Sequence, residues 1–143
     1  MAKLLLTILF VVLQLQAEAQ KQGIKGQVLW VSGNQMPGTS KKITPQQGIV
    51  REVVIYPEIK LKDTKQTDGF FTITQSVPVA TVLSKSDGSF YVKLPPGNYS
   101  VFTKESKGLF ANLFDGQGII NPVKVKPKKY TWITLAIDYE AVY

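Results

Sequence analysis

The sequence contains no histidine and no cysteine among its 143 residues. Without them the chain lacks the Ser-His and Cys-His pairs that activate a nucleophile, and it lacks the usual ligands of a zinc site. The lack of cysteine also excludes disulfide bonds, so a domain of this length must be held together by its hydrophobic core. These absences remove the commonest hydrolytic and zinc-dependent reactions from consideration.

Acidic residues are scarce as well, with 10 Asp and Glu against 17 Lys and Arg. Acid–base catalysis by paired carboxylates needs two of them in one cleft. Asp68, Asp87 and Asp115 each precede a glycine, which is typical of turns. Residues 115–118 (DGQG) lack the regular run of oxygen-bearing side chains of a calcium loop. We therefore expect no enzymatic activity and no metal or other cofactor.

The excess of basic residues gives a formal charge of +7. Such a charge attracts anionic surfaces in general, including nucleic acid and acidic glycans. The lysines are scattered along the chain, and no nucleic-acid-binding motif accompanies them. We expect the charge to act mainly in solubility, with an anionic partner as the alternative, and we expect no nucleic acid partner.

No apolar run approaches the length of about 20 residues that a membrane-spanning helix needs. The N-terminus instead has a positive start at Lys3, an apolar run over residues 4–15 and the small-x-small sequence Ala17-Glu18-Ala19. This order is typical of a signal peptide, which we place over residues 1–19, with an uncleaved membrane anchor as the alternative. No cysteine is present for lipid attachment, so we expect residues 20–143 to form a secreted or periplasmic domain without a membrane span.

Short extended runs separated by Gly and Pro turns make up the rest of the chain, and no helical period is long enough for a substantial helix. Alternating or β-branched residues predict strands over residues 24–32, 49–56, 79–85, 89–94, 99–103, 123–126 and 130–139. The fold class that follows is an all-β antiparallel sandwich of about seven strands. Residues 58–76 predict an inserted hairpin or lid whose Phe70 or Phe71 packs onto the sandwich.

Two turns stand at the centre of this pattern. Asp87-Gly88 lies between extended runs, which predicts a hairpin with a type I′ turn and positive φ at both residues. Pro96-Gly97 follows the next strand, and it suits a type II turn, in which proline takes the second position and glycine the third, where φ is positive. We expect Asp87, Gly88, Pro96 and Gly97 to determine the fold and to take no part in binding.

The residues around these turns form an ordered series, with SDGSF at 86–90, LP at 94–95 and GNY at 97–99. The series resembles the signature of carboxypeptidase regulatory-like domains, and a looser match covers residues 24–143. The resemblance implies a transthyretin-like (prealbumin-like) sandwich and a non-catalytic, accessory role. The hydroxyisourate hydrolase that shares this fold uses histidines and a C-terminal Tyr-Arg-Gly-Ser. This chain has no histidine and ends in YEAVY, so that activity is not expected.

The segment between the glycines of residues 108–118 is rich in large apolar side chains and is a candidate partner surface. Leu109, Phe110, Leu113 and Phe114 recur there at a spacing of four residues. If the segment is helical, all four side chains lie together and can cap one end of the sandwich. If it is extended, neighbours point to opposite faces, and at least two large side chains remain exposed for a partner.

An exposed row of aromatic side chains would indicate carbohydrate binding, and Trp30, Trp132, Tyr91 and Phe102 are the candidates for it. Aromatic residues on alternating strands more often belong to the core. We therefore expect first a secreted, non-catalytic structural or protein-interaction module of the cell envelope. A carbohydrate-binding module is the alternative, so the expected partner is a protein or a glycan of the envelope.

Adjacent opposite charges at Arg51 and Glu52 are the remaining candidate for a charged site. Neighbouring side chains on a strand point to opposite faces of the sheet. The two residues therefore do not pair with each other, and we assign no functional site to them.

Overall fold

The computed structural model describes residues 2–8, 21–38 and 42–143. Residues 2–8 are helical, while the predicted cleavage site at Ala17-Glu18-Ala19 lies outside the described residues. Within the described part of the chain, no helix is long and apolar enough to cross a membrane.

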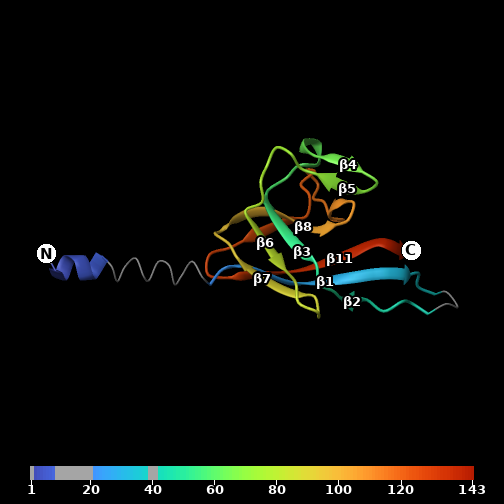
Figure 1. Cartoon of the computed structure of the whole chain (residues 1–143), viewed down its shortest axis with the longest axis horizontal. Coiled ribbons are helices and arrows are strands. Elements are labelled where there is room, and N and C mark those ends of the chain that lie inside the picture. Colours follow the sequence, from blue (N-terminus) through green and yellow to red (C-terminus); the bar gives the residue numbers. More distant parts are fainter. Residues whose placement is uncertain (1, 9–20, 39–41) are drawn as a thin grey trace.

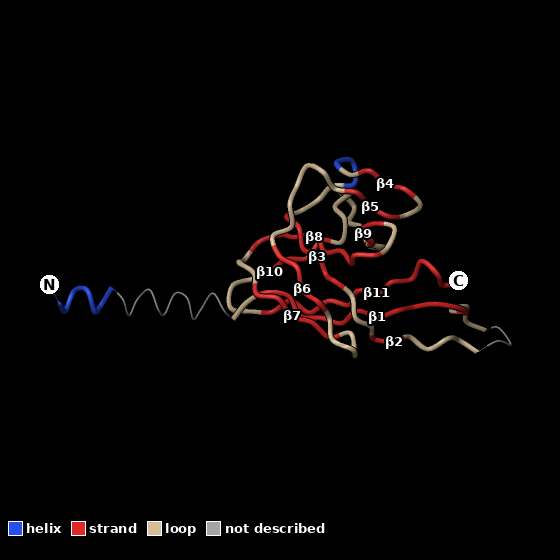
Figure 2. The backbone as a smooth tube through the Cα atoms, viewed as in Figure 1, coloured by secondary structure: helices blue, strands red, loops and turns tan. Residues whose placement is uncertain are grey.

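Two β-sheets pack face to face and form the body of the molecule (Figures 1 and 2). The four-stranded sheet contains β1 (Gly23–Asn34), β2 (Gln47–Gly48), β7 (Ser89–Lys93) and β11 (Tyr130–Val142). The seven-stranded sheet contains β3 (Glu52–Pro57), β4 (Lys65–Thr67), β5 (Phe70–Thr72), β6 (Ala80–Leu83), β8 (Gly97–Glu105), β9 (Gly108–Phe110) and β10 (Pro122–Val125). A single 3-10 turn, η1 (Leu61–Asp63), lies between β3 and β4 among the described elements. The predicted all-β sandwich is confirmed.

β1 is the central strand of the four-stranded sheet. It pairs antiparallel with β7 along its first half and with β2 further on, and it pairs parallel with β11 along nearly its whole length. The other described pairs are antiparallel, as expected. The parallel pair joins the first and last strands of the sandwich, which no short turn connects, so no local turn imposes an antiparallel direction on them.

The main core lies between the two sheets and is built from alternate residues of facing strands. Ile24 and Val28 of β1 face Val53 and Ile55 of β3, and all four are fully buried. Burying a side chain of this kind contributes about 1.5–3 kcal/mol relative to leaving it exposed. Alternation along β1 and β3 therefore supplies the inner face of each sheet.

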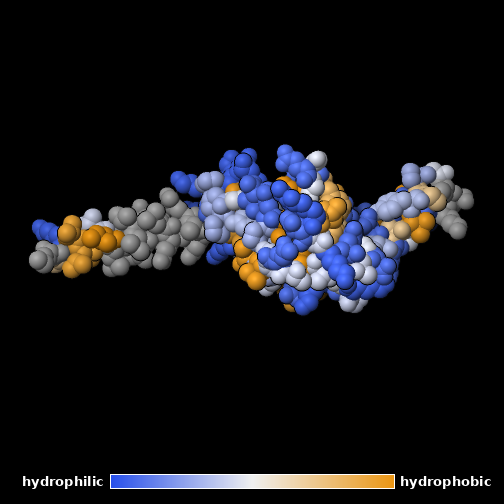
Figure 3. Space-filling model, turned by 90° about the horizontal axis from the view of Figure 1, so that it is seen from above, coloured by the Kyte–Doolittle hydropathy of each residue, from blue (hydrophilic) through white to orange (hydrophobic). Residues whose placement is uncertain are grey.

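A second, smaller core covers the outer face of the seven-stranded sheet, because alternate residues of β3 and β8 point away from the main core. The predicted inserted hairpin is present as β4 and β5, with Phe70 in the main core and Phe71 in the second one. Seen from above, the segments that cover this face are mainly hydrophilic outside, with hydrophobic residues between them (Figure 3). The second core consists of Val54, Tyr56, Ile59, Phe71, Phe102 and Ile120.

The turn at Asp87-Gly88 carries the chain from one sheet to the other. The Lys85 N–H donates to Ser89 O (2.9 Å) and the Gly88 N–H donates to Lys85 O (2.8 Å), so the turn closes locally. However, β6 pairs with β3 and β7 pairs with β1, so these strands are not partners in one sheet. Gly88 has the predicted positive φ of 86°, whereas Asp87 does not, and the type I′ prediction was wrong. The geometry fits a three-residue loop that ends in a left-handed glycine, and Asp87 Oδ1 accepts hydrogen bonds from the N–H and hydroxyl of Ser89.

The bend at Pro96-Gly97 also differs from its prediction. Gly97 is the first residue of β8 and does not have a positive φ, so the type II turn was wrong. The Tyr99 hydroxyl donates to Pro95 O at 2.6 Å and closes the bend through a side chain. A Cβ at Gly97 would lie 3.4 Å from that hydroxyl oxygen, which is an ordinary contact, so glycine is not needed there for its backbone freedom.

Candidate functional site

Three exposed side chains form a row across the outer face of the four-stranded sheet. Lys25 of β1 lies directly opposite Tyr91 of β7 on one side and opposite Trp132 of β11 on the other. Tyr91 is 55% exposed and Trp132 is 65% exposed. Because neighbouring strands lie about 4.8 Å apart, the two aromatic residues are separated by about 10 Å at their Cα atoms. We call Tyr91, Lys25 and Trp132 the aromatic row.

The side chain of Lys25 is supported by a neighbouring ring. Its Nζ lies 4.4 Å from the ring centroid of Tyr130, two residues before Trp132 on the same face of β11. A cation over an aromatic ring is stabilised by about 0.5–1 kcal/mol at an exposed site. Tyr130 was not among the predicted candidates, although the period-2 spacing of Tyr130 and Trp132 was a signal that could have identified it.

Polar side chains border the aromatic row on the side away from Tyr130. Gln27 is the next outward-facing residue of β1, and it lies opposite Ser89 and Thr134 on the flanking strands. The amide of Gln27 donates to Asp87 O (2.8 Å), and the hydroxyl of Ser89 donates to Asp87 Oδ1 (2.6 Å). These hydrogen bonds from Ser89 hold the pKa of Asp87 below its usual value. The surface thus combines flat rings with oriented polar groups, as a binding face for a hydroxylated ligand requires.

The four aromatic residues predicted as candidates for such a row lie in different environments. Phe102 is fully buried in the second core. Trp30 is half-buried against the main core, and its ring meets the Tyr139 ring edge-on at 5.3 Å. Of the four, only Tyr91 and Trp132 are exposed, because β-strand alternation turns them outward while Phe102 is covered by the insertion.

The predicted partner surface at residues 109–114 is extended rather than helical. Residues Gly108–Phe110 form β9, and Phe114 makes a β-bridge with Ile120. The helical alternative was wrong because hydrogen bonds to β8 and to the 119–121 segment hold this backbone extended. Phe110 is buried in the main core, whereas Leu113 is 56% exposed and Phe114 is 47% exposed.

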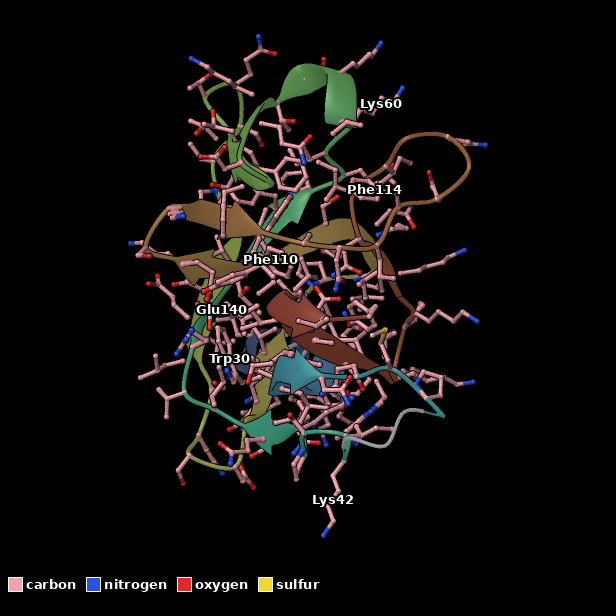
Figure 4. The ribbon with its side chains drawn as sticks, turned by 90° about the vertical axis from the view of Figure 1, so that its right-hand side faces the viewer. Trp30, Lys42, Lys60, Phe110, Phe114 and Glu140 are labelled. Atoms are coloured by element: carbon pink, nitrogen blue, oxygen red, sulfur yellow. The ribbon has the colours of Figure 1, made fainter. Side chains whose placement is uncertain are left out.

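These apolar side chains do not form one surface. Leu109 packs against the second core and Phe110 lies in the main one. The Phe114 ring lies 6.2 Å from the Phe71 ring on the outer side of the seven-stranded sheet, while Leu113 lies beside β11. Figure 4 shows Phe110 near the centre of the molecule and Phe114 beside the segment that carries Lys60. Leu113 and Phe114 are the two that remain available to a partner.

Arg51 takes part in a charged cluster that strand alternation did not predict. Its Nε lies 3.2 Å from Glu105 Oε1, and the Tyr139 hydroxyl donates to the same oxygen at 2.9 Å. Burial, followed by this hydrogen bond, raises the pKa of Tyr139. Glu52 points the other way, 3.8 Å from Lys104, so the prediction that Arg51 and Glu52 do not pair with each other is confirmed.

This cluster ties the two sheets together, since Glu105 is the last residue of β8 and Tyr139 lies on β11. It contains one carboxylate, whereas acid–base catalysis by paired carboxylates needs two. Nor do the described residues include a group of three or more acidic side chains that could hold a metal ion. Sequence alternation shows which way Arg51 points, but a partner 54 residues away is set only by the tertiary fold.

A groove on the outer face of the seven-stranded sheet has a volume of ≈ 580 Å³. Its floor is formed by residues of the second core, including Tyr56 and Phe71, and its rim carries Lys104 and Lys107. The groove is open, and Glu52, Glu105 and Ser106 line it beside the lysines, but its aromatic floor is buried. The aromatic row presents its rings to solvent, so we take it as the candidate ligand-binding surface. Comparisons with protein-family models, with curated proteins and with solved structures found no match to this chain.

Proposed function

We propose that this chain is an exported, non-catalytic binding module of the carboxypeptidase regulatory-like kind, and that its ligand is a glycan of the cell envelope. The observation that carries the proposal is the aromatic row, with Tyr91 and Trp132 exposed on one face of the sheet. Export is supported by the N-terminal sequence, and the domain type is supported by the series SDGSF, LP and GNY.

A glycan suits this face for a physical reason. The C–H faces of sugar rings are apolar and pack on flat aromatic side chains, which also present polar edges to water. Sugar hydroxyl groups need hydrogen-bonding partners at the border of the contact, and Gln27, Ser89 and Thr134 occupy that border. Two rings about 10 Å apart, across two strand spacings, can contact successive parts of an extended chain.

Tryptophan fluorescence offers a direct test, because the chain has 2 Trp residues and only Trp132 is exposed. In a Trp30→Phe variant the emission comes from Trp132 alone. Titration with envelope glycans should quench or shift this emission, and Tyr91→Ala should weaken the response. A wild-type protein that captures no glycan from envelope extract, together with a Trp30→Phe variant whose emission the extract leaves unchanged, would refute glycan binding.

A protein-interaction module is the second candidate, favoured by the exposed Leu113 and Phe114. The two functions separate in a pull-down with the exported protein. Glycan binding predicts capture that is lost in Trp132→Ala and kept in Leu113→Ala. The reverse pattern, with a defined protein partner, would favour the interaction module.

A further inference from the structure

We propose that the ligand of the aromatic row is an acidic polysaccharide, whose anionic groups bind in a lysine-lined groove beside the row. This inference rests on the proposed glycan-binding function and names its ligand class. It follows from a groove between β10 and β11 that borders Tyr130, the ring beneath Lys25.

The groove has a volume of ≈ 530 Å³ and opens at the edge where the two sheets meet. Lys124, Lys126 and Lys129 line it, together with Tyr130 and Thr131. The Thr131 hydroxyl donates to Lys124 O and links the two walls. Since Tyr130 belongs both to the groove and to the support of Lys25, a ligand chain lying on the aromatic row can continue into the groove.

The lysines of the groove are not neutralised by the protein. Residues 122–131 include four lysines and no acidic residue. Lys124, Lys126 and Lys129 are exposed, and none of them forms an ion pair with a residue that the structure describes. Like charges held close together repel each other, and a ligand of opposite charge relieves that repulsion.

The turn that presents these lysines is held in place by the fold. Lys128 has a φ of 60°, a left-handed conformation that is uncommon for a residue with a side chain. Its N–H donates to the side-chain oxygen of Gln22 at 3.1 Å, and Gln22 is buried. Because the turn is fixed before a ligand arrives, less ordering free energy opposes binding than for a loose basic tail.

The charged residues of the outer face are distributed unevenly along the strands. Lys25 lies over the Tyr130 ring, and Lys93 lies level with Tyr130 two strands away, across Gly23 of β1. The nearest outward-facing carboxylate along β11 is Asp138, six residues beyond Trp132, which is about 20 Å along a strand. We infer that the acidic groups of the polysaccharide bind at the Lys124–Lys129 end, and that the sugar rings pack on Tyr91 and Trp132.

Two matched pairs of polysaccharides test this inference, each pair having the same backbone with and without charge. The probes are polygalacturonate with its methyl ester, and dextran sulfate with dextran. Calorimetry with the exported protein should give tighter binding to at least one acidic form than to its neutral partner. Replacing Lys124, Lys126 and Lys129 together by Gln should reduce that preference about tenfold, because close charge pairs contribute to recognition.

A second triple variant controls for loss of charge alone. Lys60, Lys62 and Lys65 are exposed and lie on the insertion that covers the seven-stranded sheet, away from the aromatic row. Their joint replacement by Gln removes the same charge and should leave the preference for the acidic form within about twofold, since distant exposed charges are screened. Equal effects of the two triple variants would overturn the groove as the acidic subsite.

The remaining outcomes separate this inference from the function on which it rests. Neutral forms that bind as tightly as acidic ones, with Trp132→Ala weakening both, would overturn the acidic ligand and leave glycan binding intact. No binding of any of the four polysaccharides would overturn the acidic ligand, and glycan binding itself would be overturned only if the protein also captured no glycan from envelope extract. Tighter binding of a single-stranded oligothymidylate, lost in Trp132→Ala, would overturn the polysaccharide in favour of nucleic acid, which also combines stacking with phosphate charge.

Discussion

Phe102, on the outer face of the seven-stranded sheet, is fully buried, whereas Trp132, on the outer face of the four-stranded sheet, is 65% exposed. Both are large aromatic residues within strands, and alternation turns both away from the main core. The difference arises from what lies over each sheet. The inserted hairpin and the segment at residues 111–121 cover Phe102, while Trp132 and Tyr91 remain exposed.

Packing therefore accounts for the buried aromatic residues on the seven-stranded sheet, but it does not account for the exposed ones on the four-stranded sheet. Burial of Phe71 and Phe102 stabilises the covering segments on the seven-stranded sheet, and their rings meet edge-on at 6.0 Å. The exposed rings of the aromatic row contribute little of this kind. Single exposed apolar residues are normal, so it is the alignment of two exposed rings on one face that makes the aromatic row a candidate binding surface.

Removing a ring that is buried beneath the inserted hairpin should destabilise the protein most. Phe102→Ala should reduce the free energy of unfolding by about 3–5 kcal/mol, because it removes a fully buried ring and leaves a cavity. Thermal or urea unfolding would measure this loss. A stability close to that of the wild type would mean that the insertion does not pack on this face, and the comparison between the two faces would fail.

Residues 109–114 provide a similar contrast within one segment. Phe110→Ala should cost about 3 kcal/mol, since Phe110 lies in the main core. Phe114→Ala should cost about 1 kcal/mol or less, because Phe114 is 47% exposed. Equal and severe losses of melting temperature in both variants would show that Phe114 is part of a cap, contrary to its observed exposure.

Gly88 and Gly97 both lie where the chain crosses between the sheets, and their replacement should affect stability differently. Gly88 has a φ of 86°, and a Cβ there would collide with Val28 O, so Gly88→Ala should cost about 1–3 kcal/mol. Gly97 has an ordinary φ and room for a Cβ, so Gly97→Ala should be neutral or stabilise by up to about 1 kcal/mol. Urea midpoints that fall equally in both variants would contradict this assignment of the turns.

Strand positions and buried faces could be predicted from the sequence because they depend on local alternation. The pairing of β7 with β1 instead of β6 could not be predicted, since the Asp87-Gly88 turn is compatible with either arrangement. Contacts of the turn with β1 decide it, including the 2.7 Å hydrogen bond from the Val28 N–H to Gly88 O. Gly97 was assigned the wrong conformation because the Tyr99 hydroxyl, and not the backbone, closes that bend.

The candidate site was predictable only in part, for the same reason. Alternation could place Tyr91 and Trp132 on outward faces, but it could not place Lys25 opposite both of them. That alignment depends on the registers of one parallel and one antiparallel pair, which join segments far apart in the chain. The lysines of residues 124–129 were visible as scattered charges, and only the meeting of β10 and β11 turns them into the walls of a groove.

High pH should lower the stability of the protein through the buried tyrosines of both cores. Burial raises the pKa of Tyr56 and Tyr99 above 10.0, and burial together with the Glu105 hydrogen bond raises that of Tyr139. The folded state therefore holds these protons more tightly than the unfolded state. Their contribution to stability is complete below pH 10 and is lost as the pH rises above it.

Urea unfolding on either side of pH 10 would measure this loss. Tyr56→Phe removes one of the titrating groups from the second core and should make the decline of stability at alkaline pH less steep. The same decline in the wild type and in Tyr56→Phe would show that Tyr56 ionises as easily in the folded protein as in the unfolded chain.

The smallest expected effect on stability belongs to the aromatic row. Trp132→Ala and Tyr91→Ala should each change the free energy of unfolding by no more than about 0.5 kcal/mol, as for other exposed positions away from the core. Each should nevertheless weaken glycan binding markedly, because a ring that packs on a ligand is buried only in the complex. Unfolding curves and glycan titrations of the same two variants measure both quantities. A stability loss in Trp132→Ala comparable to that in Phe102→Ala would assign Trp132 to the packing of the sheet. A small stability loss with unchanged binding would leave its exposure unexplained by either role, and the ligand would then have to be sought at Leu113 and Phe114.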